Sequence, residues 1–148
     1  MGGVNAVAGA GRKPKVKPAA SNDFDGIIDI DAPVYMENMK HAVVIWKSII
    51  PELLKRKTLT LTDMHNVEMF CIAYHNMRLA QEDIVLNGIT VATAMGVSKN
   101  PAATVLNEAS KQMASYGAML GLDPASRNRL TGGGGKPKKN AFSEVLNM

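Results

Sequence analysis

The residues that could support catalysis or metal binding are few in this chain of 148 residues. Cys71 and His75 lie four positions apart, and His65 lies six positions before Cys71. A structural zinc site usually needs four ligands, and the chain has a single cysteine. Phe70 and Tyr74 flank the thiol, which favours a small buried side chain over a metal ligand or an activated nucleophile. We therefore expect no catalytic residue, no metal and no cofactor.

Two further patterns resemble functional motifs but lack parts that the chemistry needs. GGGGK at 132–136 resembles a phosphate-binding loop, but Pro137 stands where Ser or Thr should follow. GAGRK at 9–13 fails for the same reason. Glu82 and Asp83 are adjacent, so their side chains point in different directions on a helix and do not converge on one substrate. These patterns predict linkers and a solvated helix face.

The basic residues are concentrated towards the two ends of a chain whose net charge is +4. Residues 1–22 contain no acid, and residues 123–148 carry five cations against two acids, so the body between them is acidic. Lys and Arg on flexible arms make phosphate contacts that are salt-sensitive and nearly sequence-blind. The predicted DNA-contacting residues are Arg12, Lys13, Lys15, Lys17, Lys55, Arg56, Lys57, Arg127, Arg129, Lys136, Lys138 and Lys139.

Each group of cations also has a simpler explanation. Basic ends can merely keep a chain soluble. Residues 55–57 fall at a predicted helix C-terminus, where cations are favourable. Arg127 and Arg129 can cap or pair within the fold. Charge alone therefore leaves a DNA-binding and a structural interpretation open.

Hydrophobic periodicity predicts an all-α core at residues 23–131, between disordered basic ends at 1–22 and 132–148. The first helix is expected to begin at about residues 31–33 and to kink or restart at Pro51.

Turn and cap residues delimit the later elements. Thr62 or Asp63 should cap a long second helix that runs to about Asn87 and ends at Gly88. Residues 89–100 are rich in β-branched side chains and predict a short β-hairpin or an irregular loop. A third helix is expected to start with Asn100 as its cap and Pro101 at its first position, and to end at Gly121. A short fourth helix is expected to run from Pro124 to Leu130, with Asp123 as its cap.

Apolar residues recur along the second and third helices in narrow seams that suit a partner helix. We expect these helices to form an antiparallel hairpin whose exposed seams pack between copies of the chain. The predicted oligomer-interface residues are Val67, Phe70, Tyr74, Met77, Ile84, Val105, Ala109, Met113, Tyr116 and Leu120.

One stretch of sequence resembles a known family. Asn100-Pro101 is followed by AATVLNEASKQMASYGAMLGLDPASRNRL, which is similar to the C-terminal signature of phage terminase small subunits. In one group of these proteins an NPA-type helix start leads to a GL-x-P-x-x-R-x-x-L ending, and residues 121–130 match that ending throughout. Trp46, Leu53-Leu54 and the helix start at 61–63 also resemble that group, so the similarity covers roughly residues 33–130.

The resemblance implies a ring-shaped homo-oligomer that binds double-stranded viral DNA and initiates genome packaging in the host bacterial cytoplasm. It also implies a partner, the large terminase subunit, which holds the ATPase and nuclease activities. A single cysteine fits a reducing compartment, and no apolar run approaches the ~20 residues that cross a bilayer. Phe142, Val145 and Leu146 follow a flexible linker at helical spacing, and we predict that they dock onto the large subunit.

Two other classes of function are weighed against this one. A small dimeric transcriptional regulator would need base-reading residues near the start of a recognition helix, whereas residues 101–112 offer mainly Ala, Thr, Val and Asn before Lys111. An enzyme with Cys71 as nucleophile would need an activating environment, which the apolar neighbours of the thiol do not predict. Residues 1–32 are too short and irregular for a separate helix-turn-helix domain, which leaves sequence-specific recognition of DNA in doubt.

Overall fold

The chain folds into helices connected by short turns and one β-hairpin. The computed structural model describes residues 23–130. The prediction of a mainly helical core is confirmed, and of the two alternatives for residues 89–100 the structure has the β-hairpin. The elements are a 3-10 turn at Val34–Met36, α1 at Lys40–Lys55, a second 3-10 turn at Leu61–Asp63, α2 at Met64–Asn87, β1 at Thr90–Thr93, β2 at Gly96–Lys99, α3 at Pro101–Met119 and α4 at Pro124–Leu130.

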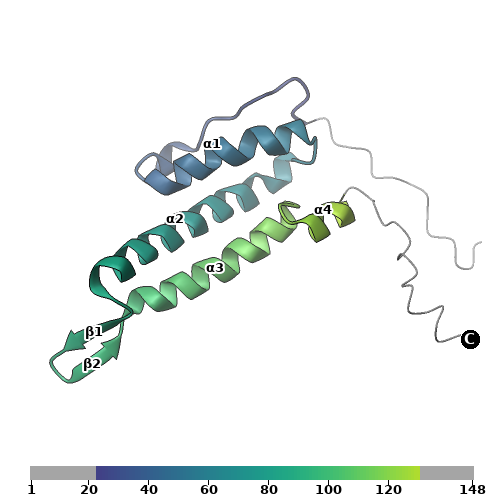
Figure 1. Cartoon of the computed structure of the whole chain (residues 1–148). Helices are drawn as coiled ribbons and strands as arrows, with labels where there is room; N and C mark the ends of the chain where they lie inside the picture. Colours follow the sequence, from purple (N-terminus) through teal and green to yellow (C-terminus); the bar gives the residue numbers. More distant parts are fainter. Residues whose placement is uncertain (1–22, 131–148) are drawn as a thin grey trace, which may run out of the picture.

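Helix α2 lies between α1 and α3, and α2 and α3 form the predicted antiparallel hairpin (Figure 1). Small residues lie at the contact between these two helices: Ala73 and Ala80 of α2, and Ala103 and Ala109 of α3, are all buried. Gly117 of α3 continues this set, since a Cβ at that position would lie 3.3 Å from the Phe70 ring. Small side chains let two helix backbones approach closely, so these residues favour the pairing of α2 with α3.

Helix α1 begins later than the sequence predicts. Pro33 starts only a single 3-10 turn, and the helix proper starts at Lys40, after Met39 adopts a non-helical conformation (ψ 77°). Tertiary contacts hold the preceding segment: Trp46 Nε1 donates to Ile30 O at 2.7 Å, and Tyr35 Oη donates to Glu68 at 2.6 Å. The expected start at residues 31–33 was therefore wrong, because contacts with α1 and α2 override the local helix signal.

Pro51 does not restart the helix. Helix α1 continues through it to Lys55. Lys57 then ends the helix in the left-handed conformation (φ 53°), and its amide donates to Leu54 O at 3.0 Å. Glycine is the usual residue at such a C-terminal position, so a lysine there is held at a conformational cost.

The predicted cap of α3 is confirmed, and that of α2 only in position. Asp63 immediately precedes α2, but its side chain makes no capping hydrogen bond to that helix. Its carboxylate instead accepts from the amide and hydroxyl of Thr60, in a capping box at the start of the Leu61–Asp63 turn. Gly88 ends α2 with a positive φ of 86°. Asn100 caps α3 by accepting from Ala102 N at 2.9 Å, and Pro101 occupies the first helical position as expected.

The β-hairpin connects α2 to α3 and extends the helical hairpin at the end opposite α4 (Figure 1). Its strands pair antiparallel with Thr90 opposite Lys99 and Thr93 opposite Gly96. Asn100 joins it to the helices, since its side-chain amide donates to Gly88 O at 2.9 Å and to Asp83 at 2.8 Å.

The hydrophobic core is concentrated where α1, the first half of α2 and the end of α3 meet. Trp46, Ile50 and Leu53 of α1 are almost completely buried, and they pack in one cluster with Val67 and Leu120. Within residues 23–130, no helix is long and apolar enough to cross a membrane.

Candidate nucleic-acid interface

Both boundaries of the described chain lie at the same end of the helical hairpin (Figure 1). Asp23 accepts a hydrogen bond from Leu61 N at 3.2 Å, which places the start of the described chain beside the start of α2. Leu130 lies against Gly121, just beyond the last turn of α3. We call this region, formed by the last turn of α1, the Leu61–Asp63 turn and α4, the terminal end. Seven of the predicted DNA-contacting residues lie outside the described residues: Arg12, Lys13, Lys15, Lys17, Lys136, Lys138 and Lys139.

The three cations at the end of α1 have different surroundings. Arg56 is held by Glu52 one turn earlier, with an N–O distance of 2.7 Å. Lys57 lies 3.6 Å from Asp25 in an exposed ion pair. Lys55 is exposed and makes no ion pair with any residue between 23 and 130. Two acids on the same chain therefore partly neutralise this group, and Lys55 is its most available member.

The two arginines of α4 contribute to the turn between α3 and α4. Arg127 is half-buried and donates to Leu122 O at 3.2 Å. Arg129 is exposed and donates to Ser126 Oγ at 2.8 Å. Asp123 caps α4 by accepting from Ser126 N at 2.8 Å, and hydrogen bonds from Ser126 hold the pKa of the Asp123 carboxyl below its usual range. The matched GL-x-P-x-x-R-x-x-L segment thus forms a compact turn in which Arg127 has a structural contact.

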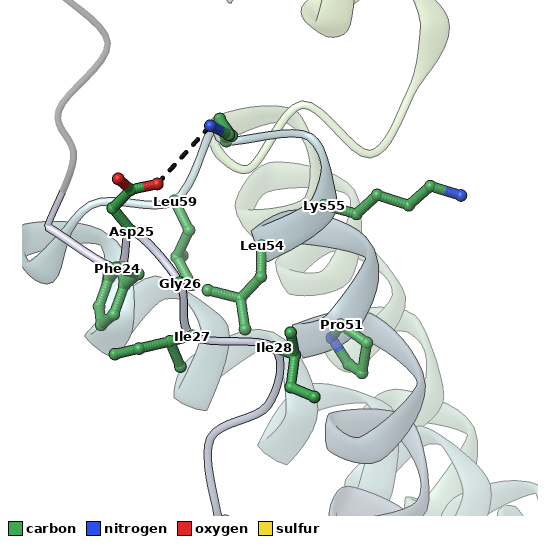
Figure 2. Close-up of a pocket in the computed structure, with 10 residues that line it drawn as sticks. Phe24, Asp25, Gly26, Ile27, Ile28, Pro51, Leu54, Lys55 and Leu59 are labelled. Atoms are coloured by element: carbon green, nitrogen blue, oxygen red, sulfur yellow. Dashed lines mark ion pairs between the residues drawn. The ribbon is translucent and has the colours of Figure 1, made fainter.

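A pocket of about 450 Å³ lies at the terminal end beside Lys55 and Lys57 (Figure 2). Leu54 and Leu59 line it from the body of the protein, and the segment 24–28, which begins with a turn at residues 23–26, lines it from the other side. Figure 2 shows the Lys57–Asp25 ion pair at one edge and the Lys55 side chain extending from another. Sequence reasoning missed this pocket because residues 24–28 and 54–59 are far apart in the chain and carry no shared periodic pattern.

The predicted seam residues divide between the interior of one chain and its surface. Val67, Phe70, Ala109 and Leu120 are buried within the single chain. Half-buried positions are Tyr74, Met77, Ile84, Met113 and Tyr116, and Val105 is exposed. The inner part of the seams therefore joins α2 to α3 of the same chain, and only the outer part is accessible to a neighbour.

Large exposed apolar side chains also lie at the opposite end of the hairpin. We call the β-hairpin and the adjoining ends of α2 and α3 the hairpin end. There Val85 is 84% exposed, Leu86 is 81% exposed and Met95 is fully exposed. Val85 and Leu86 also line an open depression of about 720 Å³ together with Ile84 and Leu106. Arg78, Gln81 and Glu82 line the same depression, so apolar and polar side chains meet there.

Cys71 is buried, as predicted. Burial, with a further contribution from Glu68, raises the pKa of its thiol to about 12, so the thiol is not activated as a nucleophile. Among the described residues, no group of three or more His, Cys, Asp or Glu side chains is placed to hold a metal ion.

A polar cluster between α1 and α2 was not predicted. Glu82 of α2 lies 2.7 Å from His41 Nε2 and 3.2 Å from Lys40 Nζ, both on α1. The His41 ring lies 5.6 Å from that of the buried His75. The partners are about forty positions apart in sequence, so only the packing of α1 on α2 brings them together.

These features define a small helical-hairpin protein in which both boundaries of the described chain, residues 23 and 130, lie at the terminal end. The family model for the phage terminase small subunit matches residues 42–137, which is more than half of the chain. The chain therefore belongs to the phage terminase small subunit family, as its signature at residues 100–130 predicted. Searches of curated proteins and of solved structures give no match.

Proposed function

We propose that this protein is the non-catalytic, DNA-binding subunit of a phage packaging terminase and works as a ring-shaped homo-oligomer. The observation that carries the proposal is the family match over residues 42–137. The arrangement of the chain supports it, because the two basic segments join the body at the terminal end, while apolar surface is exposed at the hairpin end. Contacts between copies and contacts with DNA would then use different parts of each subunit.

In this proposal neighbouring subunits pack through the hairpin end and the outer seam residues. Such an interface joins different surfaces of each copy, and it closes into a ring when the rotation between neighbours permits. Double-stranded viral DNA is bound in the host bacterial cytoplasm through phosphate contacts from the basic arms and Lys55. Because the contacts are mainly to phosphates, binding depends strongly on salt and weakly on sequence.

The large terminase subunit is the second proposed partner. Phe142, Val145 and Leu146 provide a compact apolar motif at the far side of a Gly-rich linker, a design that suits docking onto another protein. The motif lies outside the described residues. Replacing Phe142 and Leu146 by Ser should abolish co-purification with the large subunit and leave DNA binding intact.

The central experiment measures the mass of the native particle and the salt dependence of its binding to duplex DNA. We expect an oligomer at micromolar concentration. Changing Arg12, Lys13, Lys15 and Lys17 to Gln should flatten the slope of log affinity against log salt by about 0.9 for each phosphate that the arm no longer neutralises. The matched control changes the exposed Lys99 and Lys111 to Gln, outside the terminal end. A monomeric particle, or a slope altered only by the control, would contradict the proposal, and a footprint confined to one promoter site would favour a transcriptional regulator instead.

A further inference from the structure

The pocket at the terminal end has an apolar interior with a cationic rim. Phe24, Ile27, Leu54 and Leu59 supply apolar surface, and Pro51 closes one side (Figure 2). Its volume of about 450 Å³ lies within the range of roughly 300–1,000 Å³ that is typical of binding pockets. A few apolar side chains of a peptide can therefore be accommodated in it.

The front of this pocket is incompletely covered. Ile28 is 84% exposed and Ile27 is 45% exposed, although both line the pocket. Covering such side chains removes apolar surface from water and contributes about 25 cal/mol per Å² buried. The pocket therefore presents apolar surface that an additional segment of chain would stabilise.

We propose that this pocket binds the C-terminal segment of the same chain, residues 141–148, through Phe142, Val145 and Leu146. These three residues have the spacing that places side chains on one face of a helical turn. Their apolar side chains match the lining of the pocket. Docking to the large subunit is proposed for the same side chains, so it would compete with this intramolecular binding.

The length of the connecting chain supports binding within one molecule. Eleven residues, 131–141, separate Leu130 from Phe142. A Gly-rich linker of this length spans about 20 Å on average. Leu130 lies against Gly121, and the adjacent Leu120 belongs to the same buried cluster as Leu54 and Leu59, two walls of the pocket. The linker thus starts close to the pocket, and the segment that it carries has an effective concentration that favours intramolecular binding.

Charge favours this segment over the other end of the chain. The rim carries Lys55, which makes no ion pair within residues 23–130, and Lys57, which is already paired with Asp25. Residues 141–148 contain one acid, Glu144, and no base, whereas residues 1–22 contain four cations and no acid. Glu144 can therefore interact favourably with Lys55, while the N-terminal arm would be repelled from the rim.

Disulfide trapping in the full-length chain tests the proposal. Ile28→Cys with Val145→Cys should form an intrachain disulfide in a glutathione buffer roughly tenfold faster than Met119→Cys with Val145→Cys. Met119 is the matched control, because it is exposed and lies only two residues before Gly121, where Leu130 packs. The native Cys71 is buried and its thiol pKa is raised to about 12, so it should not compete.

Added substitutions test which side chains are responsible. Phe142→Ser with Leu146→Ser should reduce the Ile28→Cys rate to that of the Met119→Cys control. Lys55→Glu should slow the reaction about two- to fivefold, and Glu144→Lys on that background should restore the rate, because a surface ion pair contributes modestly. Equal rates at the two positions, a rate unaffected by the serine substitutions or by Lys55→Glu, or disulfides between chains detected by mass would each overturn the proposal. All the sites changed in the body are exposed, so loss of folding should not obscure the result.

Discussion

The two ends of the α2–α3 hairpin differ in the size of the side chains that they bury. In the core that adjoins the terminal end, large side chains such as Trp46, Ile50 and Leu53 are almost fully buried. At the hairpin end, the buried apolar residues are alanines, Ala80 and Ala103, while large apolar side chains lie on the surface. The comparison indicates that the large core side chains near the terminal end provide most of the folding energy of the single chain, whereas the hairpin end combines small buried residues with large exposed apolar ones.

The ion pairs of the terminal end decide which cations are available there. At the terminal end, Glu52 and Asp25 partly neutralise the cations that end α1. Of the three cations that end α1, this pairing leaves Lys55 without an ion pair among residues 23–130, and we expect the arms and Lys55 to supply the proposed affinity for DNA. The contrast between the two ends can be tested with substitutions whose expected effects decrease in size.

The largest effect should come from the core of the terminal end. Trp46→Ala removes a fully buried ring and its hydrogen bond to Ile30 O, and should lower the free energy of unfolding by about 3–5 kcal/mol. Urea denaturation followed by far-ultraviolet circular dichroism measures this value without relying on tryptophan fluorescence. Leu86→Ala is the control at the hairpin end, and because Leu86 is exposed, it should change the value by no more than about 0.5 kcal/mol in dilute protein. A similar loss in both variants would remove the distinction between the ends.

The second effect concerns assembly. Val85→Glu with Leu86→Glu places charge in the exposed apolar surface of the hairpin end, and should weaken self-association by about 30-fold or more if these residues are central to an interface. Sedimentation velocity over a range of concentrations measures the change.

Val44→Glu is the matched control for this variant, since Val44 is an exposed apolar residue on α1. Its self-association should stay unchanged. The double variant should also unfold at the same urea concentration as the original chain in dilute protein. Normal assembly of the double variant, or an equal defect in Val44→Glu, would place the interface elsewhere.

The third effect tests what holds the hairpin end together in the absence of large buried side chains. Asn100 is buried and bonds to Ala102 N, Gly88 O and Asp83, so Asn100→Ala should cost about 1–2 kcal/mol. Amide hydrogen exchange should accelerate at residues 88–101 and remain slow in the core of the terminal end. Asn107→Ala, an exposed change on the same helix, is the control and should alter neither quantity. Uniformly faster exchange would mean that the two ends unfold as one unit.

Local chemistry predicted the hairpin and its boundaries well. Gly88, Asn100-Pro101 and Asp123 act through their own backbone conformation and nearest neighbours, so their roles could be read from the sequence. The seams on α2 and α3 likewise predicted that the two helices pair.

Features that depend on distant partners could not be predicted. The late start of α1 follows from contacts of Trp46 and Tyr35 with segments outside that helix. The pairing of Lys57 with Asp25 and the pocket behind it need the fold of residues 24–28 against α1. The DNA-contacting roles of the arms remain predictions from charge.

The smallest effect concerns the contact between α1 and α2, midway between the ends. His75 is buried beside His41 and Lys40 of α1, and burial followed by these two groups lowers its pKa below the ordinary value of 6.5, although Glu82 acts in the opposite direction. The folded chain therefore holds His75 neutral, while the unfolded chain takes up a proton as the pH falls through about 6.5. The free energy of unfolding should consequently decrease on acidification from about pH 7.5 to 5.5. The pKa of Glu82 is lowered from 4.5, chiefly by its hydrogen bonds from Lys40 and then His41, so the stability it contributes is lost only in a separate, more acidic range.

His75→Gln should flatten the decrease between pH 7.5 and 5.5, and His65→Gln, an exposed control, should preserve it. A free energy of unfolding that stayed constant or rose on acidification would contradict this prediction. So would a His75→Gln variant that kept the full slope.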